Sequence, residues 1–355
     1  MLEENASTGI PDVCREPMRA DKDSTARLRL VGGRESQMLE IPDDALRVAA
    51  AATSPVTVDL PFRSGNVMLH ARLTTRPGAR TVLVLFHGAL DRKTRNPPTF
   101  ITPSKTLMAA AHCLSIADPS ILRHPRLAIS WYAGDQNCDT QGLVSEIIRS
   151  VSEVLGVSRR IYHGTSGGGF AALAFSHGDP DSVAVVGSPQ TNIESYYALA
   201  IERYRKAAWP DLAEGRPLSD VITSDLCKVY AAGFSNTVIY VQSIGDRHHY
   251  LKHALPFCAA IAGTKAAGRF FLHSDFWGRA GHVTEPREYV FWIKAATMLD
   301  DLDPEKLLKT RFRVESSVNR LQAAKGEAAA KPKTFAPADL EIHALLAELR
   351  KRKES

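Results

Sequence analysis

Residues 159–169 read Arg-Arg-Ile-Tyr-His-Gly-Thr-Ser-Gly-Gly-Gly, an apolar run that ends abruptly in a glycine-rich turn. A helix-like apolar run follows at once, over residues 170–175. A strand, a G-x-S-x-G turn and a helix make up a nucleophile elbow, which lifts a serine hydroxyl clear of a sheet edge. The serine backbone is strained there, and its glycine neighbours let the strand and helix approach closely. We therefore expect Ser166 to be a nucleophile; otherwise the turn only connects, or holds a phosphate on its amides.

A nucleophilic serine needs a base that accepts its proton and an acid that orients the base. In the elbow architecture these follow the serine in the order acid, histidine, each just after a strand. Residues 237–243 are rich in β-branched and aromatic side chains, which predicts a strand, and Asp246 follows them. A short apolar run at 270–272 precedes His282. We expect Ser166, Asp246 and His282 to form a catalytic triad. Asp275 is the alternative acid, although it follows no clear strand end.

The third requirement is an oxyanion hole, in which two amide donors face the negative oxygen of a tetrahedral intermediate. The amide of Gly167, directly after the serine, is the first expected donor. Residues 81–86 are an unbroken apolar run, typical of a strand covered on both faces, and His87-Gly88-Ala89 comes next. This His-Gly pair resembles the oxyanion loop of many α/β-hydrolases. The resemblance implies that the Ala89 amide is the second donor and that His87 organises the loop.

Together these features resemble the α/β-hydrolase superfamily over about residues 55–300. The alternation of predicted strands and helices likewise favours an α/β fold, with a mostly parallel, twisted sheet covered by helices on both faces. Alternating runs at 56–60 and 67–73 predict an N-terminal antiparallel hairpin, which the superfamily also shows. Two further strands are expected, at 113–117 and 127–131.

The pattern divides the chain into three parts. Residues 1–52 are mixed and polar and are expected to be irregular or partly disordered. The hydrolase domain is expected over 53–300, interrupted by a helical insertion at 192–236. An insertion at this point usually forms a lid in the superfamily; ordinary helices packed outside the sheet are the alternative. Residues 301–355 are expected to be a helical extension with a linker near 323–336.

The last predicted helix, at 337–352, carries a stripe of apolar side chains on one face. The stripe consists of Ile342, Leu345, Leu346 and Leu349. We expect this face to dock on the body of the protein, on a second copy or on a partner, and the sequence does not choose among them.

Two groups of side chains are candidates for substrate contact. Basic residues follow the oxyanion donor and the acid, and they would favour an anionic substrate, unless they only form a solvated surface. Aromatic residues of the insertion would line the pocket, although their spacing also suits packing. The candidates are Arg92, Lys93, Arg247, Tyr196, Tyr197 and Trp209.

Composition narrows the class of protein and its location. The net charge of +5 owes much to the basic run at 350–353, and without interleaved aromatic residues it does not indicate nucleic-acid binding. No apolar stretch approaches a membrane span, and the amino terminus has no features of a secretory signal. Five scattered cysteines without a C-x-x-C pair indicate reduced thiols and a cytoplasmic location.

No cofactor is expected, and the adjacent His248 and His249 do not predict a metal site, because neighbouring side chains point apart. The sequence therefore favours a serine hydrolase that cleaves a small carboxylic ester through an acyl-enzyme on Ser166. Acyl transfer is the alternative, because the same acyl-enzyme yields either product. A non-catalytic binding or assembly module on this fold is the third interpretation.

Overall fold

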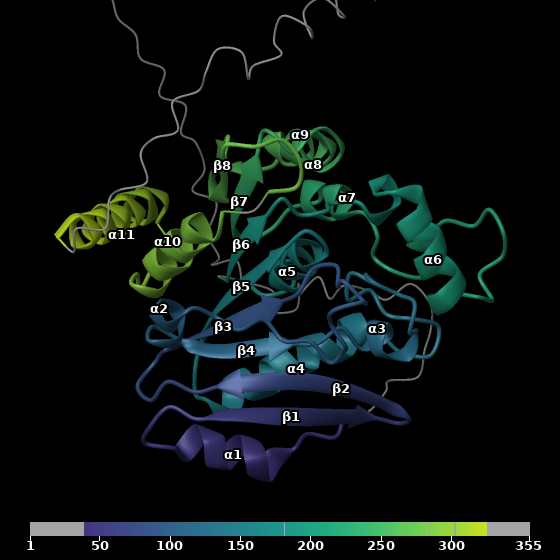
Figure 1. Ribbon diagram of the computed structural model, residues 1–355, viewed down its shortest axis with the longest axis horizontal. Helices are drawn as coiled ribbons and strands as arrows, with labels where there is room; N and C mark the ends of the chain where they lie inside the picture. The colour runs from purple at the N-terminus through teal and green to yellow at the C-terminus, as the bar shows by residue number, and fades with distance from the viewer. Residues whose placement is uncertain (1–38, 181, 284, 302, 325–355) are drawn as a thin grey trace, which may run out of the picture.

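The computed structural model describes residues 39–324 except 181, 284 and 302 (Figure 1). Within this range the strands are β1 (Thr57–Ser64), β2 (Val67–Thr74), β3 (Thr81–Phe86), β4 (His112–Ile116), β5 (Arg159–Thr165), β6 (Val183–Gly187), β7 (Thr237–Ser243) and β8 (Phe270–Asp275). They form one eight-stranded sheet in the order β1-β2-β4-β3-β5-β6-β7-β8. Strands β3 to β8 run parallel to one another, whereas β2 is antiparallel to both β1 and β4. The predicted mostly parallel sheet with an N-terminal antiparallel hairpin is confirmed.

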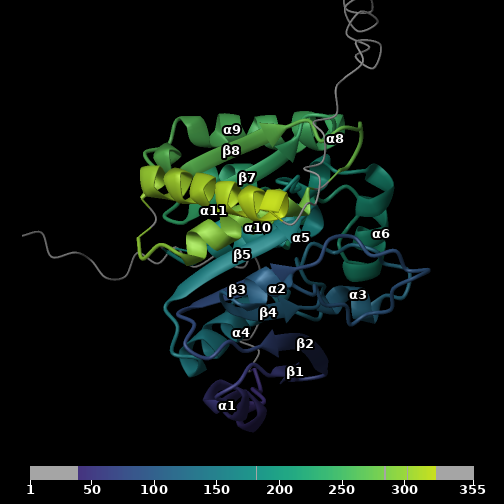
Figure 2. The same ribbon diagram turned by 60° about the vertical axis from the view of Figure 1, so that its left-hand side comes forward.

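Helices cover both faces of the sheet, as Figures 1 and 2 show from two sides. One face carries α1 (Asp43–Ala51), α4 (Thr140–Val154), α5 (Gly167–His177), α7 (Leu226–Ala231) and α9 (Leu255–Ala262). The other face carries α2 (Lys105–Met108), α10 (Pro286–Thr297) and α11 (Pro304–Ala324). Each layer has its own buried apolar cluster, and both clusters include side chains of the central strands. The sheet is thus sandwiched between two hydrophobic layers, which explains why β3, β6 and β7 are buried along their whole length.

The strand predicted at 127–131 is wrong, because the chain is irregular there. Trp131 and Tyr132 have φ angles of 54° and 55°, in the left-handed region, which no strand contains. The buried carboxylate of Asp118, at the start of α3 (Pro119–Arg123), holds this loop. It accepts hydrogen bonds from the Tyr132 amide at 2.8 Å and from Ser130 Oγ at 2.7 Å. Hydrogen bonds to a buried carboxylate, rather than pairing with a neighbouring strand, therefore determine the path of this loop.

The segment 192–236 lies between β6 and β7 and contains no strand. It holds α6 (Ala198–Ala208), α7 and the short 3-10 helices Ile193–Ser195 and Leu218–Asp220. The α6 helix is tied to the loop that follows Trp131, since Tyr204 Oη donates to the Gly134 carbonyl at 2.7 Å. In Figure 1, α6 stands beyond the ends of the parallel strands rather than against either face of the sheet.

Beyond the sheet, α11 begins the extension predicted after residue 301. The linker from residue 325 onward, the helix predicted at 337–352 and most of the predicted lead-in lie outside the described residues. The four cysteines within the described residues are free thiols. None of the described helices combines the length and the apolarity needed to cross a bilayer.

Candidate active site

Ser166 stands at a sharp turn between β5 and α5, with φ of 56° and ψ of −123°. Such a conformation is strained in a residue with a side chain. A Cβ atom on Gly164 would lie 2.2 Å from the Gly168 carbonyl oxygen, and one on Gly168 would lie 2.2 Å from the Phe86 carbonyl oxygen. Only glycine therefore fits at either position. The close approach of strand and helix that the sequence implied is present.

The acid and the histidine meet beside this turn. Asp246 follows β7 and is 3% exposed. His282 Nδ1 lies 2.5 Å from Asp246 Oδ2. Asp275, the alternative acid, is the last residue of β8, so the expectation that it follows no strand was wrong. Its carboxylate is exposed and accepts a hydrogen bond from the Phe276 amide. The histidine is thus paired with Asp246.

Asp246 is held in its ionised form. Burial alone would raise the pKa of this carboxyl, but hydrogen bonds from His249 and His282 outweigh burial and hold the pKa well below its ordinary value. An ionised acid in contact with Nδ1 fixes the tautomer of His282 that leaves Nε2 free to accept a proton.

The loop after β3 lies against the serine turn. A Cβ atom on Gly88 would be 3.5 Å from Ser166 Cβ and 3.9 Å from the Gly167 amide nitrogen. His87 holds the loop, because its Nδ1 lies 2.8 Å from the Gly88 carbonyl oxygen and its Nε2 accepts a hydrogen bond from the Asp118 amide. Among the described residues, neither the Gly167 amide nor the Ala89 amide has a hydrogen-bond acceptor. Both donors are free to bind an oxygen atom.

No protein-family model and no curated protein matches the sequence. Among solved structures, a candidate dipeptidyl aminopeptidase IV from Bacteroides ovatus matches 70% of this chain with a TM-score of 0.50 at 14% identity, and the match covers 36% of that protein. The match to an acylaminoacyl peptidase from Pyrococcus horikoshii covers 74% of this chain and 45% of that protein, with a TM-score of 0.47 at 12% identity. The match to carboxyl esterase 2 from Tuber melanosporum covers 75% of this chain and 86% of that protein, with a TM-score of 0.45 at 14% identity. The fold is that of the α/β-hydrolases.

On this hydrolase fold, the aromatic residues predicted to contact substrate differ in position. The ring of Tyr196 lies 5.9 Å from that of Trp131 and 6.0 Å from that of His249. Tyr197 is 53% exposed and stacks on His248 at 4.2 Å. Trp209 is buried, and its Nε1 donates to Tyr204 Oη at 3.1 Å. Trp209 therefore packs in the core beneath α6, and its contact with substrate stays a prediction.

The basic residues predicted to contact substrate lie on the surface. Lys93 and Arg247 are exposed, and Arg92 is half-buried. In the part of the chain that the structure describes, none of the three hydrogen-bonds to Ser166 or to the Asp246–His282 pair. Their role in substrate binding stays a prediction.

Two residues at the site were not found from the sequence. Gln190, in the loop after β6, donates a hydrogen bond from Nε2 to Ser166 Oγ at 2.9 Å. The same Nε2 lies 2.7 Å from His249 Nε2, and His249 Nδ1 lies 2.9 Å from Asp246 Oδ2. His249 belongs to the single helical turn α8 (Arg247–His249). Its spacing of three residues from Asp246 would have indicated one shared face, but the glutamine carries no sequence signal.

Asp246, His249 and His282 could also hold a metal ion, since their ligand atoms all lie within 4.8 Å of one another. The adjacency of His248 and His249 in the sequence gave no sign of this cluster, in which the ring centres of His249 and His282 lie 4.3 Å apart beside the Asp246 carboxylate. Both Nδ1 atoms already contact Asp246. A metal ion would have to displace both of these hydrogen bonds.

Proposed function

We propose that this protein is a serine hydrolase that cleaves a carboxylic ester through an acyl-enzyme on Ser166. One observation carries the proposal: a strained serine, an Asp246–His282 pair and two free amide donors lie at the same edge of the sheet. A connecting turn needs none of these groups. A phosphate-binding turn does not need the paired acid and histidine.

The groups are assigned the roles of a catalytic triad. The proton of Ser166 moves to His282 Nε2 as Oγ bonds to the carbonyl carbon of the ester. The Gly167 and Ala89 amides stabilise the negative oxygen of the tetrahedral intermediate. The bond to the alcohol then breaks, and the alcohol oxygen takes the proton from His282. Water attacks the acyl-enzyme in the same manner, which releases the carboxylic acid and returns the proton to Ser166.

The insertion at 192–236 is proposed to be the lid of the site. The contact of Tyr196 with Trp131 and His249 supports this role, because both of these residues contact Gln190, the hydrogen-bond partner of Ser166. An anionic small molecule is the proposed substrate, which Arg92, Lys93 and Arg247 would attract from the surface. The free thiols suit the reducing cytoplasm, where we place the protein.

The experiment is turnover of short- and long-chain p-nitrophenyl esters, with and without an alcohol acceptor. We expect release of p-nitrophenol without acceptor, and its loss in Ser166→Ala. Release of p-nitrophenol that depends wholly on the acceptor would show that the reaction is acyl transfer rather than hydrolysis. If the folded wild-type protein turns over no ester and reacts with no serine-directed probe, the hydrolase proposal fails. A non-catalytic binding or assembly module is then the remaining interpretation.

A further inference from the structure

We propose that Gln190 and His249 form a hydrogen-bonded path from the nucleophile to the acid, and that this path positions Ser166 Oγ for attack. The path runs from Ser166 through Gln190 and His249 to Asp246. His282 also contacts Asp246, but within the described residues no hydrogen bond joins it to Ser166. The inference rests on the proposed function for its catalytic consequence. The hydrogen-bonded path itself can be tested without any activity.

The orientation of the Gln190 amide follows from Trp131. The indole Nε1 of Trp131 can only donate a hydrogen bond, and it lies 3.2 Å from Gln190 Oε1. A flipped amide would place two donors against each other. Both side chains are fully buried, so water does not replace the contact. The NH₂ group of Gln190 must therefore face Ser166 and His249.

The orientation of Gln190 in turn fixes the protonation of His249. An amide nitrogen has no lone pair to offer, so His249 Nε2 must accept one of its two hydrogen atoms. The remaining proton of a neutral imidazole then lies on Nδ1, where it is donated to Asp246. Burial favours this neutral form, because it lowers the pKa of His249.

This arrangement decides which histidine can act as the base. Both ring nitrogens of His249 are engaged, so it cannot accept the proton of Ser166. His282 contacts Asp246 through Nδ1, its side chain is 39% exposed, and it keeps Nε2 free. Two histidines thus share one carboxylate, one as the base and the other as a positioning residue.

The hydrogen bond from Gln190 acts on the nucleophile itself. It occupies one lone pair of Ser166 Oγ and leaves the hydroxyl proton to be donated elsewhere. It also strengthens as negative charge develops on Oγ during attack and when Oγ leaves the second intermediate. Removing this donor should therefore lower kcat and leave KM nearly unchanged.

The kinetic test compares two buried glutamines. Gln190→Met removes the donor at similar volume, and Gln141→Met makes the same change on α4. We expect Gln190→Met to lower kcat for p-nitrophenyl acetate by about tenfold to a hundredfold with KM within about twofold, as for a lost hydrogen bond to a charged group. Gln141→Met should keep wild-type kinetics. An unchanged kcat in folded Gln190→Met would overturn the proposal.

Two substitutions of His249 separate the two halves of the path. His249→Asn keeps a donor near Asp246 and loses the acceptor for Gln190, whereas His249→Gln keeps a group that can accept from Gln190. We expect His249→Asn to lose as much kcat as Gln190→Met, the double variant to be no worse than either, and His249→Gln to stay within about threefold of wild type. Fully additive losses would contradict a shared path.

The final test is proton NMR of the folded wild-type protein, which needs no turnover. We expect two far-downfield imidazole N–H resonances, one lost in His249→Asn and the other in His282→Asn. A single such resonance that survives His249→Asn would overturn the path. If both resonances appear but a serine-directed probe does not label the wild type, the path stands and the proposed function fails.

Discussion

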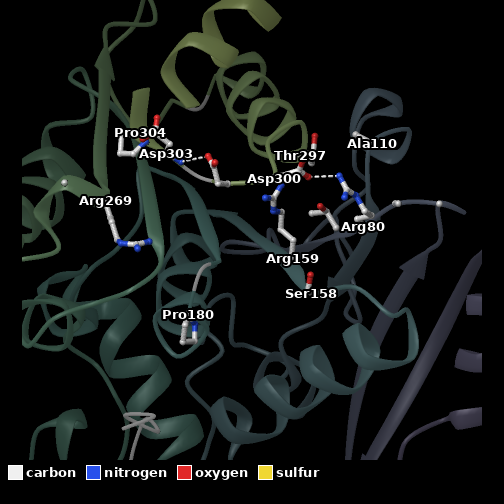
Figure 3. Close-up of a pocket in the computed structure, with 15 residues that line it drawn as sticks. Arg80, Ala110, Ser158, Arg159, Pro180, Arg269, Thr297, Asp300, Asp303 and Pro304 are labelled. Carbon is white, nitrogen blue, oxygen red and sulfur yellow. Dashed lines mark hydrogen bonds and ion pairs between the residues drawn. The ribbon is translucent and has the colours of Figure 1, made fainter. Parts of the chain in front are cut away.

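The two edges of the sheet differ in what they contain. At the carboxyl edge, Ser166 is 8% exposed and its hydrogen-bond partner Gln190 is fully buried. At the amino edge lies an open cavity of about 1170 Å³ beside the starts of β3 and β5 (Figure 3). A cavity by itself does not mark a catalytic site. The chemistry that we propose is at the other edge, where Ser166 has a strained backbone and polar side chains are buried and paired.

The amino-edge cavity is lined by charged groups that already have partners. Arg80 pairs with Asp300 at 2.6 Å, and the side chains are 83% and 84% exposed. Arg159 Nη1 donates to the Ala296 carbonyl at 3.3 Å. The residues that line this cavity include no histidine or cysteine. Exposed ion pairs contribute little to stability or to binding, so this edge should tolerate substitution.

The largest expected difference between the edges is catalytic. Asp246→Asn removes the negative charge that fixes the tautomer of His282, and we expect turnover of p-nitrophenyl acetate to fall by about 10⁴-fold. His282→Ala should cost at least as much, because it removes the base. Asp300→Asn, the same change at the amino edge, should leave turnover at the wild-type level. Equal rates for the two asparagine variants would break the comparison.

The second difference is the room for a side chain at a glycine of each edge. Gly168→Ala would place Cβ 2.2 Å from the Phe86 carbonyl oxygen, whereas a Cβ on Gly268, which lines the amino-edge cavity, meets no atom within 4 Å. We expect the free energy of unfolding to fall by about 3 kcal/mol or more in Gly168→Ala. In Gly268→Ala it should change by less than about 1 kcal/mol. Urea denaturation measures both, and a Gly168→Ala variant as stable as wild type would contradict the packing described.

The third difference is a pH dependence of stability. Burial, with the nearby His249 and His248, lowers the pKa of His253 to about 3, and the Thr191 amide donates to its Nδ1. Between pH 6.5 and 3 the unfolded chain therefore binds the proton more readily, and stability falls as the pH falls. Each such histidine contributes at most about 1.4 kcal/mol per pH unit in this range.

Urea denaturation at pH 7.5 and 5.5 measures this slope. We expect His253→Gln to lose less stability than wild type between the two pH values, whatever its stability at pH 7.5. The prediction fails if the two proteins lose the same free energy of unfolding.

The smallest effect is expected at the exposed ion pair of the amino edge. Arg80→Ala removes the contact with Asp300, and we expect the free energy of unfolding to change by no more than about 0.5 kcal/mol. Ester turnover should not change. A loss of several kcal/mol, or of activity, would show that the amino-edge cavity has a structural or functional role.

The fold and the serine turn could be predicted because their signals are local. The glycines around Ser166 and the buried runs of β3 and β7 reflect steric and solvation demands that each segment meets by itself. The junctions after these strands then placed Asp246 and Ala89 at the same sheet edge. Position along the chain was enough to predict where each of these residues lies, and their catalytic roles stay predictions.

The errors and omissions share a different cause. The irregular path at 127–131 depends on Asp118, and the burial of Trp209 depends on Tyr204 and on the docking of α6. Gln190 meets Ser166 and His249 only through tertiary contacts across the site. None of these contacts leaves a pattern in the sequence, because the partners come from separate elements.

The most direct test of the account is the intact mass of the folded protein after reaction with a fluorophosphonate probe. We expect one adduct per chain, on Ser166 by peptide mapping, and no adduct in Ser166→Ala. A folded wild-type protein that stays unmodified, or an adduct that persists in Ser166→Ala, would contradict the claim that Ser166 is the nucleophile.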